Sequence, residues 1–129
     1  MSDAGLLLDS SAVLALLFAE TGGEHVAAVL SGAAISSVNL SEVVAKMHDR
    51  GLGPELVAAN LSDLELTVIP FDRAIAERAG ALREPTRANG LSLGDRACLA
   101  TAEACGLSIL TADRAWQAVD IGIVIKQLR

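Results

Sequence analysis

The sequence predicts a three-layer α/β/α sandwich built on a central parallel sheet of about five strands. Short apolar runs alternate along the chain with longer segments that show helical spacing. The apolar runs contain almost no polar residues, as expected for strands that are covered on both faces. Parallel strands need crossover connections, and right-handed crossovers through helices place helices on both faces of the sheet. We therefore expect a single domain over residues 1–129.

Five short apolar runs are the expected strands. The first is followed at once by Asp9, and the third is stopped by Pro70, which has no N–H to offer to a sheet. Runs of this length between turn signals are typical of buried strands. The expected strands are residues 6–8, 33–36, 66–69, 107–110 and 122–125.

The segments between these runs carry the start and stop signals of helices. Gly22 and Gly23 separate the first two helices, Pro54 suits the first turn of a helix, and Gly106 suits the end of one. The expected helices cover residues 10–19, 24–30, 39–50, 54–64, 72–83, 95–105 and 114–118.

Composition limits how the protein can hold a nucleic acid. Hydrophobic residues make up 52% of the chain and aromatic residues only 2%. Stacking of bases on aromatic rings therefore cannot be the main way in which the protein binds nucleic acid. The formal net charge is -6, which argues against a simple nucleic-acid-binding module with a basic surface. An enzyme whose bound divalent ions supply local positive charge remains compatible with this composition.

Cysteine spacing and the N-terminus bear on the compartment. Cys98 and Cys105 lie in one expected helix, separated by ~10 Å along its axis, which is too far for a disulfide. Both follow an apolar pattern, so we expect buried free thiols, as in a reducing cytosol. The N-terminus lacks the basic segment of a secretory signal, and no apolar stretch reaches the ~20 residues of a membrane span. The sequence predicts a soluble, cytoplasmic protein.

Four acidic residues stand where an open α/β sheet binds its ligands. Asp9 follows the first expected strand and Asp113 lies just beyond the fourth. Ligands of such sheets bind beyond the carboxyl ends of the strands. If these two strands are neighbours, Asp9 and Asp113 face one another across the crevice. Glu42 and Asp95 lie in the first turns of helices and can point to the same edge.

A cluster of acids is unfavourable unless a cation neutralises it. All four side chains are oxygen donors, and the two histidines, His25 and His48, fall in helices away from these junctions. Oxygen-only sites favour Mg²⁺ or Mn²⁺ over Zn²⁺. Such ions can activate a water and stabilise a leaving oxygen, so hydrolysis of a phosphodiester is the natural reaction class.

Each acid also has a structural alternative. Residues 39–42 and 92–95 both match the spacing of a capping box, which would explain Glu42 and Asp95. Asp9 and Asp113 can simply cap the helices that they precede. The metal-site interpretation therefore depends on the set of four rather than on any one acid. The two roles are compatible, since a helix N-terminus stabilises an ionised carboxylate.

The segments LLLDSSAVLALL, NLSEVVAK, LSLGDRACLATA and ILTADRAW together closely resemble the PIN-domain ribonucleases, and the nearest branch is the VapC-type toxins of bacterial type II toxin–antitoxin pairs. The resemblance covers essentially the whole chain, in order. It implies a PIN-like fold and an endoribonuclease that depends on Mg²⁺ or Mn²⁺, uses metal-activated water and acts as a toxin. It also implies a homodimer, an RNA substrate and a cognate antitoxin that covers the site.

The resemblance assigns roles to individual residues. Thr111 matches the hydroxyl residue that helps to orient the site, and Ser10 stands where the family often has Thr. Trp116 stands where the family often has Phe, and we expect it to pack. The implied metal-binding and catalytic residues are Asp9, Glu42, Asp95 and Asp113, with Asp113 completing the site.

Arg96 and Arg114 each directly follow one of these acids. Either guanidinium can contact a substrate phosphate or offset the acidic charge. A solvated surface arginine is the more common situation and remains the alternative for both. The acidic net charge is less typical of an enzyme that cleaves RNA.

Other functions with a strand-end Asp fit less well. Phosphatases of the haloacid-dehalogenase type need a second Asp at the position of Ser11, and phosphorylation receivers need an acceptor Asp where Pro70 and Phe71 follow the third strand. A catalytically inactive PIN-like or receiver-like metal-binding interaction domain is the alternative that the sequence leaves open.

Overall fold

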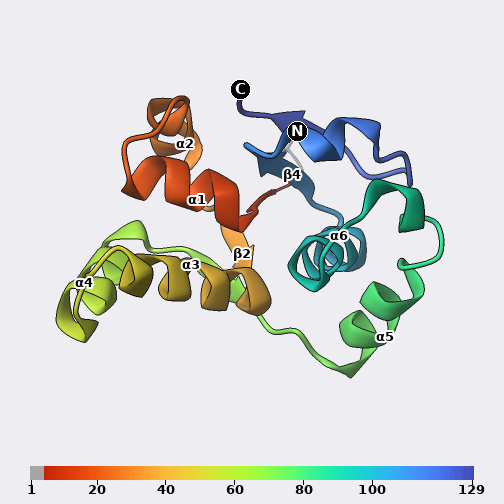
Figure 1. Ribbon diagram of the computed structural model, residues 1–129, viewed down its shortest axis with the longest axis horizontal. Helices are drawn as coiled ribbons and strands as arrows, with labels where there is room; N and C mark the ends of the chain where they lie inside the picture. Colours follow the sequence, from red (N-terminus) through yellow and green to blue (C-terminus); the bar gives the residue numbers. More distant parts are fainter. Residues whose placement is uncertain (1–4) are drawn as a thin grey trace.

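The five strands of the sheet are all parallel and lie in the order β3-β2-β1-β4-β5. The computed structural model describes residues 5–129 (Figure 1). The predicted α/β fold class with a parallel sheet of five strands is confirmed. The strands are β1 (Leu6–Leu8), β2 (Ala34–Ser36), β3 (Thr67–Ile69), β4 (Ser108–Thr111) and β5 (Ile125–Gln127).

The helices between the strands begin and end within a few residues of the predicted ranges. Two short segments, η1 (Arg87–Asn89) and η2 (Arg114–Ala118), are 3₁₀ helices. The α-helices are α1 (Ser10–Leu17), α2 (Gly23–Val29), α3 (Ser37–Asp49), α4 (Pro54–Leu64), α5 (Arg73–Ala81) and α6 (Leu93–Cys105).

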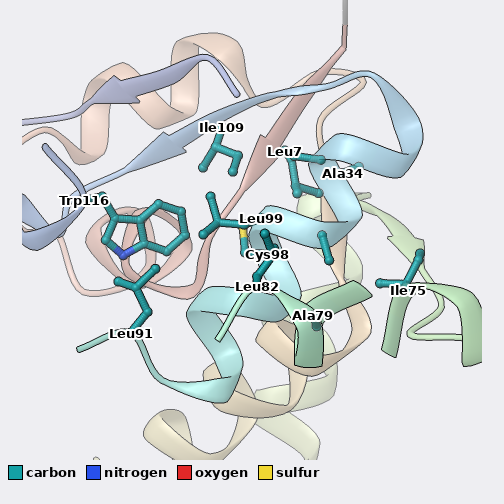
Figure 2. Packing of buried hydrophobic residues seen from close by; sticks show 12 residues of the cluster. Leu7, Ala34, Ile75, Ala79, Leu82, Leu91, Cys98, Leu99, Ile109 and Trp116 are labelled. Carbon is teal, nitrogen blue, oxygen red and sulfur yellow. The ribbon is translucent and has the colours of Figure 1, made fainter. Parts of the chain in front are cut away.

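Neighbouring residues of one strand pack into different cores, and this alternation defines the two helical layers. Leu8 packs with residues of α1 to α4, whereas Leu7 packs with residues of α5, α6 and η2. In Figure 1, α1 to α4 lie on one side of the strands and α5 and α6 on the other. Figure 2 shows Leu7 and Ile109 of the sheet facing the layer that contains Leu99 and Trp116. Trp116 is buried, as the sequence predicted.

Two expectations from the sequence are corrected by the structure, one about the fifth strand and one about Cys105. The fifth strand covers Ile125–Gln127 rather than residues 122–125, because Gly122 turns the chain at a φ of 81° and pairing with β4 begins at Ile125. Val124, within the apolar run that suggested the strand, is 60% exposed. Cys98 is buried as expected, but Cys105 is exposed, since it lies in the last turn of α6; neither forms a disulfide within residues 5–129.

The order of the strands creates one point where the chain changes direction across the sheet. From β1 the chain proceeds outward through β2 to β3, and it then returns to place β4 on the other side of β1. Leu8 pairs with Leu110, so β1 and β4 end side by side. The residues that follow these two strands are therefore adjacent at the edge where open α/β sheets bind ligands.

Within residues 5–129, every helix is too short or too polar to cross a lipid bilayer.

The close approach of α1 and α2 depends on a glycine. A Cβ at Gly23 would lie 2.5 Å from the carbonyl oxygen of Ala15, a backbone atom that cannot move without the helix. We predict that Gly23→Ala lowers the free energy of unfolding by about 1–3 kcal/mol, the usual effect of overpacking. Gly80→Ala is the matched control, because Gly80 is an exposed residue of α5 with open space around its Cα.

The control should be neutral or more stable by about 0.5–1 kcal/mol, since alanine favours helix over glycine. Urea unfolding of both variants measures the difference. If Gly23→Ala were as stable as Gly80→Ala, the packing described for α1 and α2 would be wrong.

Candidate active site

Asp9 is the most buried of the four predicted acids. It follows β1 directly, is 4% exposed and caps α1, accepting a hydrogen bond from the Ala12 N–H at 2.9 Å. Burial raises the pKa of Asp9 to about 6, and the nearby charge of Asp95 adds to this rise. Hydrogen bonds from Thr111, Ala12 and Ser11 act in the opposite direction.

Two hydroxyls fix the Asp9 carboxylate. Thr111, the last residue of β4, donates to Asp9 Oδ2 at 2.5 Å, and its Oγ1 accepts the Asp113 N–H at 3.0 Å. Ser11 donates to the same carboxylate, 2.7 Å from Oδ1, and its Oγ accepts the Ala112 N–H at 2.9 Å. These bonds tie the ends of β1 and β4 together, so the two hydroxyls hold Asp9 and the backbone of Asp113 in one network.

Glu42 approaches the same edge from α3. Its Oε1 accepts hydrogen bonds from Ser10 Oγ at 3.0 Å and from Asn39 Nδ2 at 2.8 Å. The carboxylate also lies against Gly94 in the first turn of α6, because a Cβ there would be 2.6 Å from Glu42 Cδ. The capping-box interpretation of residues 39–42 is wrong: α3 begins at Ser37 and is capped by Ser36.

Asp95 stands in the first turn of α6. Ser92 and Asp95 form a complete capping box, so the structural role predicted for Asp95 is present. Partial burial raises the pKa of Asp95, and the charges of Asp113 and Glu42 contribute to the rise, whereas hydrogen bonds from Ser92 lower it. Asp95 therefore caps its helix and also lies among the other acids.

Asp113 is the exposed member of the group. It follows β4 and caps η2, with Oδ1 accepting the Ala115 N–H at 2.9 Å. Its interaction with Asp95 places it within electrostatic reach of the others. The structure thus gathers the four acids, Asp9, Glu42, Asp95 and Asp113, at one edge of the sheet.

No basic side chain of residues 5–129 neutralises this cluster. The ion pairs of the described chain join Arg50, Arg73, Arg78, Arg87 and Arg129 to other glutamates. Arg96 lies beside Asp95 in sequence, but its Nη1 donates to the Ala79 carbonyl at 3.0 Å, which holds the guanidinium against α5. Arg114 is exposed on η2. Within the described part of the chain, the acids therefore repel one another without a basic partner.

A groove of about 400 Å³ opens beside the cluster, between α1 and α3. Its lining includes Ser11, which holds Asp9, and both basic and acidic side chains: Lys46, Arg50, Glu20 and Asp49. The Arg50 guanidinium lies 4.0 Å from the centre of the Phe18 ring, which fixes one wall of the groove.

Comparison with known proteins assigns this fold. The PIN domain family model matches residues 6–122.

The chain belongs to the PIN-domain family.

PIN domains are nucleases, so the acid cluster lies in a domain of a family that hydrolyses nucleic acids. A search of curated proteins gives no match. Among solved structures, the DNA-bound VapBC complex from Salmonella typhimurium superposes with a TM-score of 0.75 at 22% identity, covering 98% of this chain and 100% of that one. A toxin–antitoxin complex from Klebsiella pneumoniae gives 0.71 at 22%, covering 89% and 92%. VapBC-5 from Mycobacterium tuberculosis gives 0.64 at 22%, covering 98% and 99%. At such identities the likeness establishes the fold.

The donor chemistry of this PIN domain fits a hard divalent cation. The four acids offer only oxygen, and among residues 5–129 they have no counter-cation. Within the same residues, no three His, Cys, Asp or Glu side chains converge into a ready-made ligand set. Mg²⁺ is usually bound through one or two carboxylates with several waters retained, so a loosely spaced group of acids suits it better than a closed cage.

Two residues of the site were not identified from the sequence. The sequence indicates Ser11 only as a residue that a phosphatase would not have, and Asn39 only as a candidate helix cap. The D-x-S spacing of Asp9 and Ser11 at a helix N-terminus is the signal that could have indicated Ser11, because a serine there can reach back to the carboxylate. The partners of Asn39 lie on α3 and α6, so only the fold reveals them.

The buried charge of Asp9 makes a prediction about stability. Its pKa is about 6 in the folded protein against 3.8 ordinarily, so the protonated form favours folding and this stabilisation is lost as the pH rises from about 4 to 6. At pH 8 the ionised group should destabilise the metal-free protein by about 3 kcal/mol relative to its protonated form. Asp9→Asn keeps a neutral capping side chain, so we predict that it is more stable than the wild type in EDTA.

Denaturant unfolding at pH 5 and pH 8 tests this, and the advantage of Asp9→Asn should be larger at pH 8. Asp72→Asn is the control, since Asp72 caps α5 with the same geometry but is exposed. A loss of stability in Asp9→Asn at pH 8 would contradict the account of the buried charge.

Proposed function

We propose that this PIN domain is an endoribonuclease that depends on Mg²⁺ or Mn²⁺ and acts as the VapC-type toxin of a toxin–antitoxin pair. The observation that carries the proposal is the cluster of four acids, without a counter-charge among residues 5–129, at the edge where β1 and β4 end. At neutral pH the charges of such a cluster destabilise the folded protein. In a nuclease fold, this cost supports a role for the acids in binding a cation and cleaving a phosphodiester.

The acids and the hydroxyl residues around them have different proposed roles. We infer that Asp9, Glu42 and Asp95 hold the cation and that Asp113 completes the site on its exposed side. Ser11 and Thr111 hold Asp9 from β1 and β4, and Ser10 holds Glu42 from α1. A bound divalent ion supplies positive charge for the phosphate and lowers the pKa of water. The hydroxyls keep the carboxylates in place before substrate arrives, so little reorganisation is needed.

The substrate's phosphates need basic contacts that the acid cluster lacks. Arg114 is exposed directly after Asp113 and is the better placed of the two predicted arginines. Arg96 already donates one nitrogen to the Ala79 carbonyl, so its contact with a phosphate would use the remaining donors. We propose that Lys46 and Arg50 offer further contacts to the RNA, although Glu20 and Asp49 line the same groove.

The proposed partners follow from the resemblance and the fold together. Structures that superpose on nearly the whole chain are toxin–antitoxin and VapBC complexes. We propose that a cognate antitoxin covers the acid cluster, that residues 1–129 act as one domain, and that two copies pair. An enzyme that acts on cellular RNA under antitoxin control would work in the cytoplasm.

The alternative function is a catalytically inactive PIN-like or receiver-like interaction domain, in which the acids bind a cation but no phosphodiester is hydrolysed. Cleavage of single-stranded RNA with and without EDTA separates the two, since only the enzyme responds to the chelator.

We predict that Asp9→Asn and Asp95→Asn each lower RNA cleavage by at least about 100-fold and relieve growth inhibition in cells, with the fold intact. Changing a residue that only supports a metal ligand already costs about 10–100-fold, and these two are proposed to touch the metal. Asp72→Asn, in a similar capping position outside the cluster, should cleave as the wild type does.

Cleavage is measured on a labelled RNA with added Mg²⁺ or Mn²⁺, and circular dichroism checks the fold. If either site variant cleaved at the wild-type rate, the assignment of the active site would be wrong.

A further inference from the structure

Asn39 is a buried polar side chain that the proposed reaction does not yet explain. It lies in the first turn of α3 and is 2% exposed. Its Nδ2 donates to Glu42 Oε1 at 2.8 Å and to the Gly94 carbonyl at 3.1 Å. Both partners are acceptors, so the amide nitrogen must face them. Asn39 therefore connects the acid of α3 to the first turn of α6.

The other end of this amide has no partner. Asn39 Oδ1 is buried and makes no hydrogen bond to residues 5–129. A buried acceptor without a partner is unfavourable, and an apolar side chain of similar size would avoid it. Among residues 5–129, the hydrogen bonds of the Asn39 side chain are therefore those of Nδ2, which are directed at Glu42 and at the first turn of α6.

The hydrogen bonds to Glu42 orient its carboxylate through one of the two oxygens. Asn39 and Ser10 both donate to Oε1. No hydrogen bond from residues 5–129 reaches Oε2, which lies over Gly94, next to Asp95. The bonds therefore hold one oxygen of the carboxylate and leave the other available beside the second acid.

Gly94 completes the arrangement because it has no side chain. A Cβ at this position would be 2.6 Å from Glu42 Cδ and 2.7 Å from Oε1. Only glycine lets the carboxylate lie directly on the backbone of α6. The three residues that place Glu42 come from three helices: Ser10 from α1, Asn39 from α3 and Gly94 from α6.

We propose that Asn39 is a positioning residue that fixes the Glu42 carboxylate over the first turn of α6, so that Glu42 and Asp95 act on the same cation. The inference rests on the proposed metal-dependent function for its catalytic consequence. The contacts of Asn39 themselves do not depend on that function. Asn39 acts through Glu42 and touches neither substrate nor metal.

Asn39→Leu tests the proposal, because leucine matches asparagine in shape and removes both donors and the unpartnered oxygen. The affinity for Mn²⁺ alone, measured by electron paramagnetic resonance without RNA, should fall by about 10–100-fold, as for other supporting residues of metal sites. Thr101→Val is the matched control. Thr101 is buried in α6, and its hydroxyl donates to the Ala97 carbonyl of the same helix as its one hydrogen bond within residues 5–129. The Mn²⁺ affinity of Thr101→Val should therefore equal that of the wild type.

Gly94→Ala tests the same idea without changing a buried polar group. The clash falls on the end of the flexible Glu42 side chain, so the fold should survive while Glu42 is displaced. Mn²⁺ affinity should again fall by at least about 10-fold. Gly80→Ala, a helical glycine with open space around it, should leave the affinity unchanged.

A double-mutant cycle shows whether Asn39 acts through Glu42. In the Glu42→Gln background, Asn39→Leu should change Mn²⁺ affinity by less than about threefold, because its target has already lost its charge. Wild-type affinity in Asn39→Leu, or an undiminished loss in the Glu42→Gln background, would overturn the proposal. If the wild type bound no Mn²⁺, this proposal and the proposed function would both fall.

The outcome also separates the two claims. If the wild type failed to cleave RNA while Asn39→Leu still weakened Mn²⁺ binding through Glu42, the positioning role would stand and the nuclease function would be wrong.

Discussion

The constraint on which the site depends is the burial of a carboxylate at the end of the first strand. Asp9 follows β1 directly and is almost fully enclosed, although burial raises its pKa to about 6 and so opposes its charge at neutral pH. The neighbouring elements are arranged to keep it there. The pairing of β1 with β4 brings Thr111 to Asp9, and the start of α1 brings Ser11 and the Ala12 N–H. Hydrogen bonds hold the charge without neutralising it, which leaves that role to a cation.

Capping and metal binding share the same side chains in this molecule. Asp9 and Asp113 are N-caps, and Asp95 completes the capping box of α6 with Ser92, while all three lie in the acid cluster. A helix start provides free N–H groups and a positive end of the helix dipole, both of which favour an ionised carboxylate. In each case one carboxylate oxygen accepts the capping N–H, and the negative charge remains available to a ligand. Glu42 is the exception: side chains from α1 and α3 hold it instead of a backbone cap.

Much of this could be predicted from the sequence, for identifiable reasons. The alternation of apolar runs with helical segments predicts the layers, and residues that follow strands, such as Asp9 and Asp113, are placed at the sheet edge by topology alone. The last strand was misplaced because its apolar run ends where pairing begins, at Ile125. The partners of Glu42 could not be predicted, because Ser10, Asn39 and Gly94 are brought together only by the packing of α1, α3 and α6. A local motif search identifies Glu42 but attributes it to a capping box with Asn39, whereas α3 is capped by Ser36.

The central claim is that the buried carboxyl group of Asp9, whose pKa is about 6, gives up its proton when a divalent cation binds. Calorimetric titration of the wild type with Mn²⁺, in buffers of different ionisation enthalpy, counts the protons released on binding. Because the pKa of Asp9 is about 6, binding at pH 6 should release at least about half a proton, and binding at pH 8 close to none. Equal proton release at the two pH values, or no binding at either, would contradict the account.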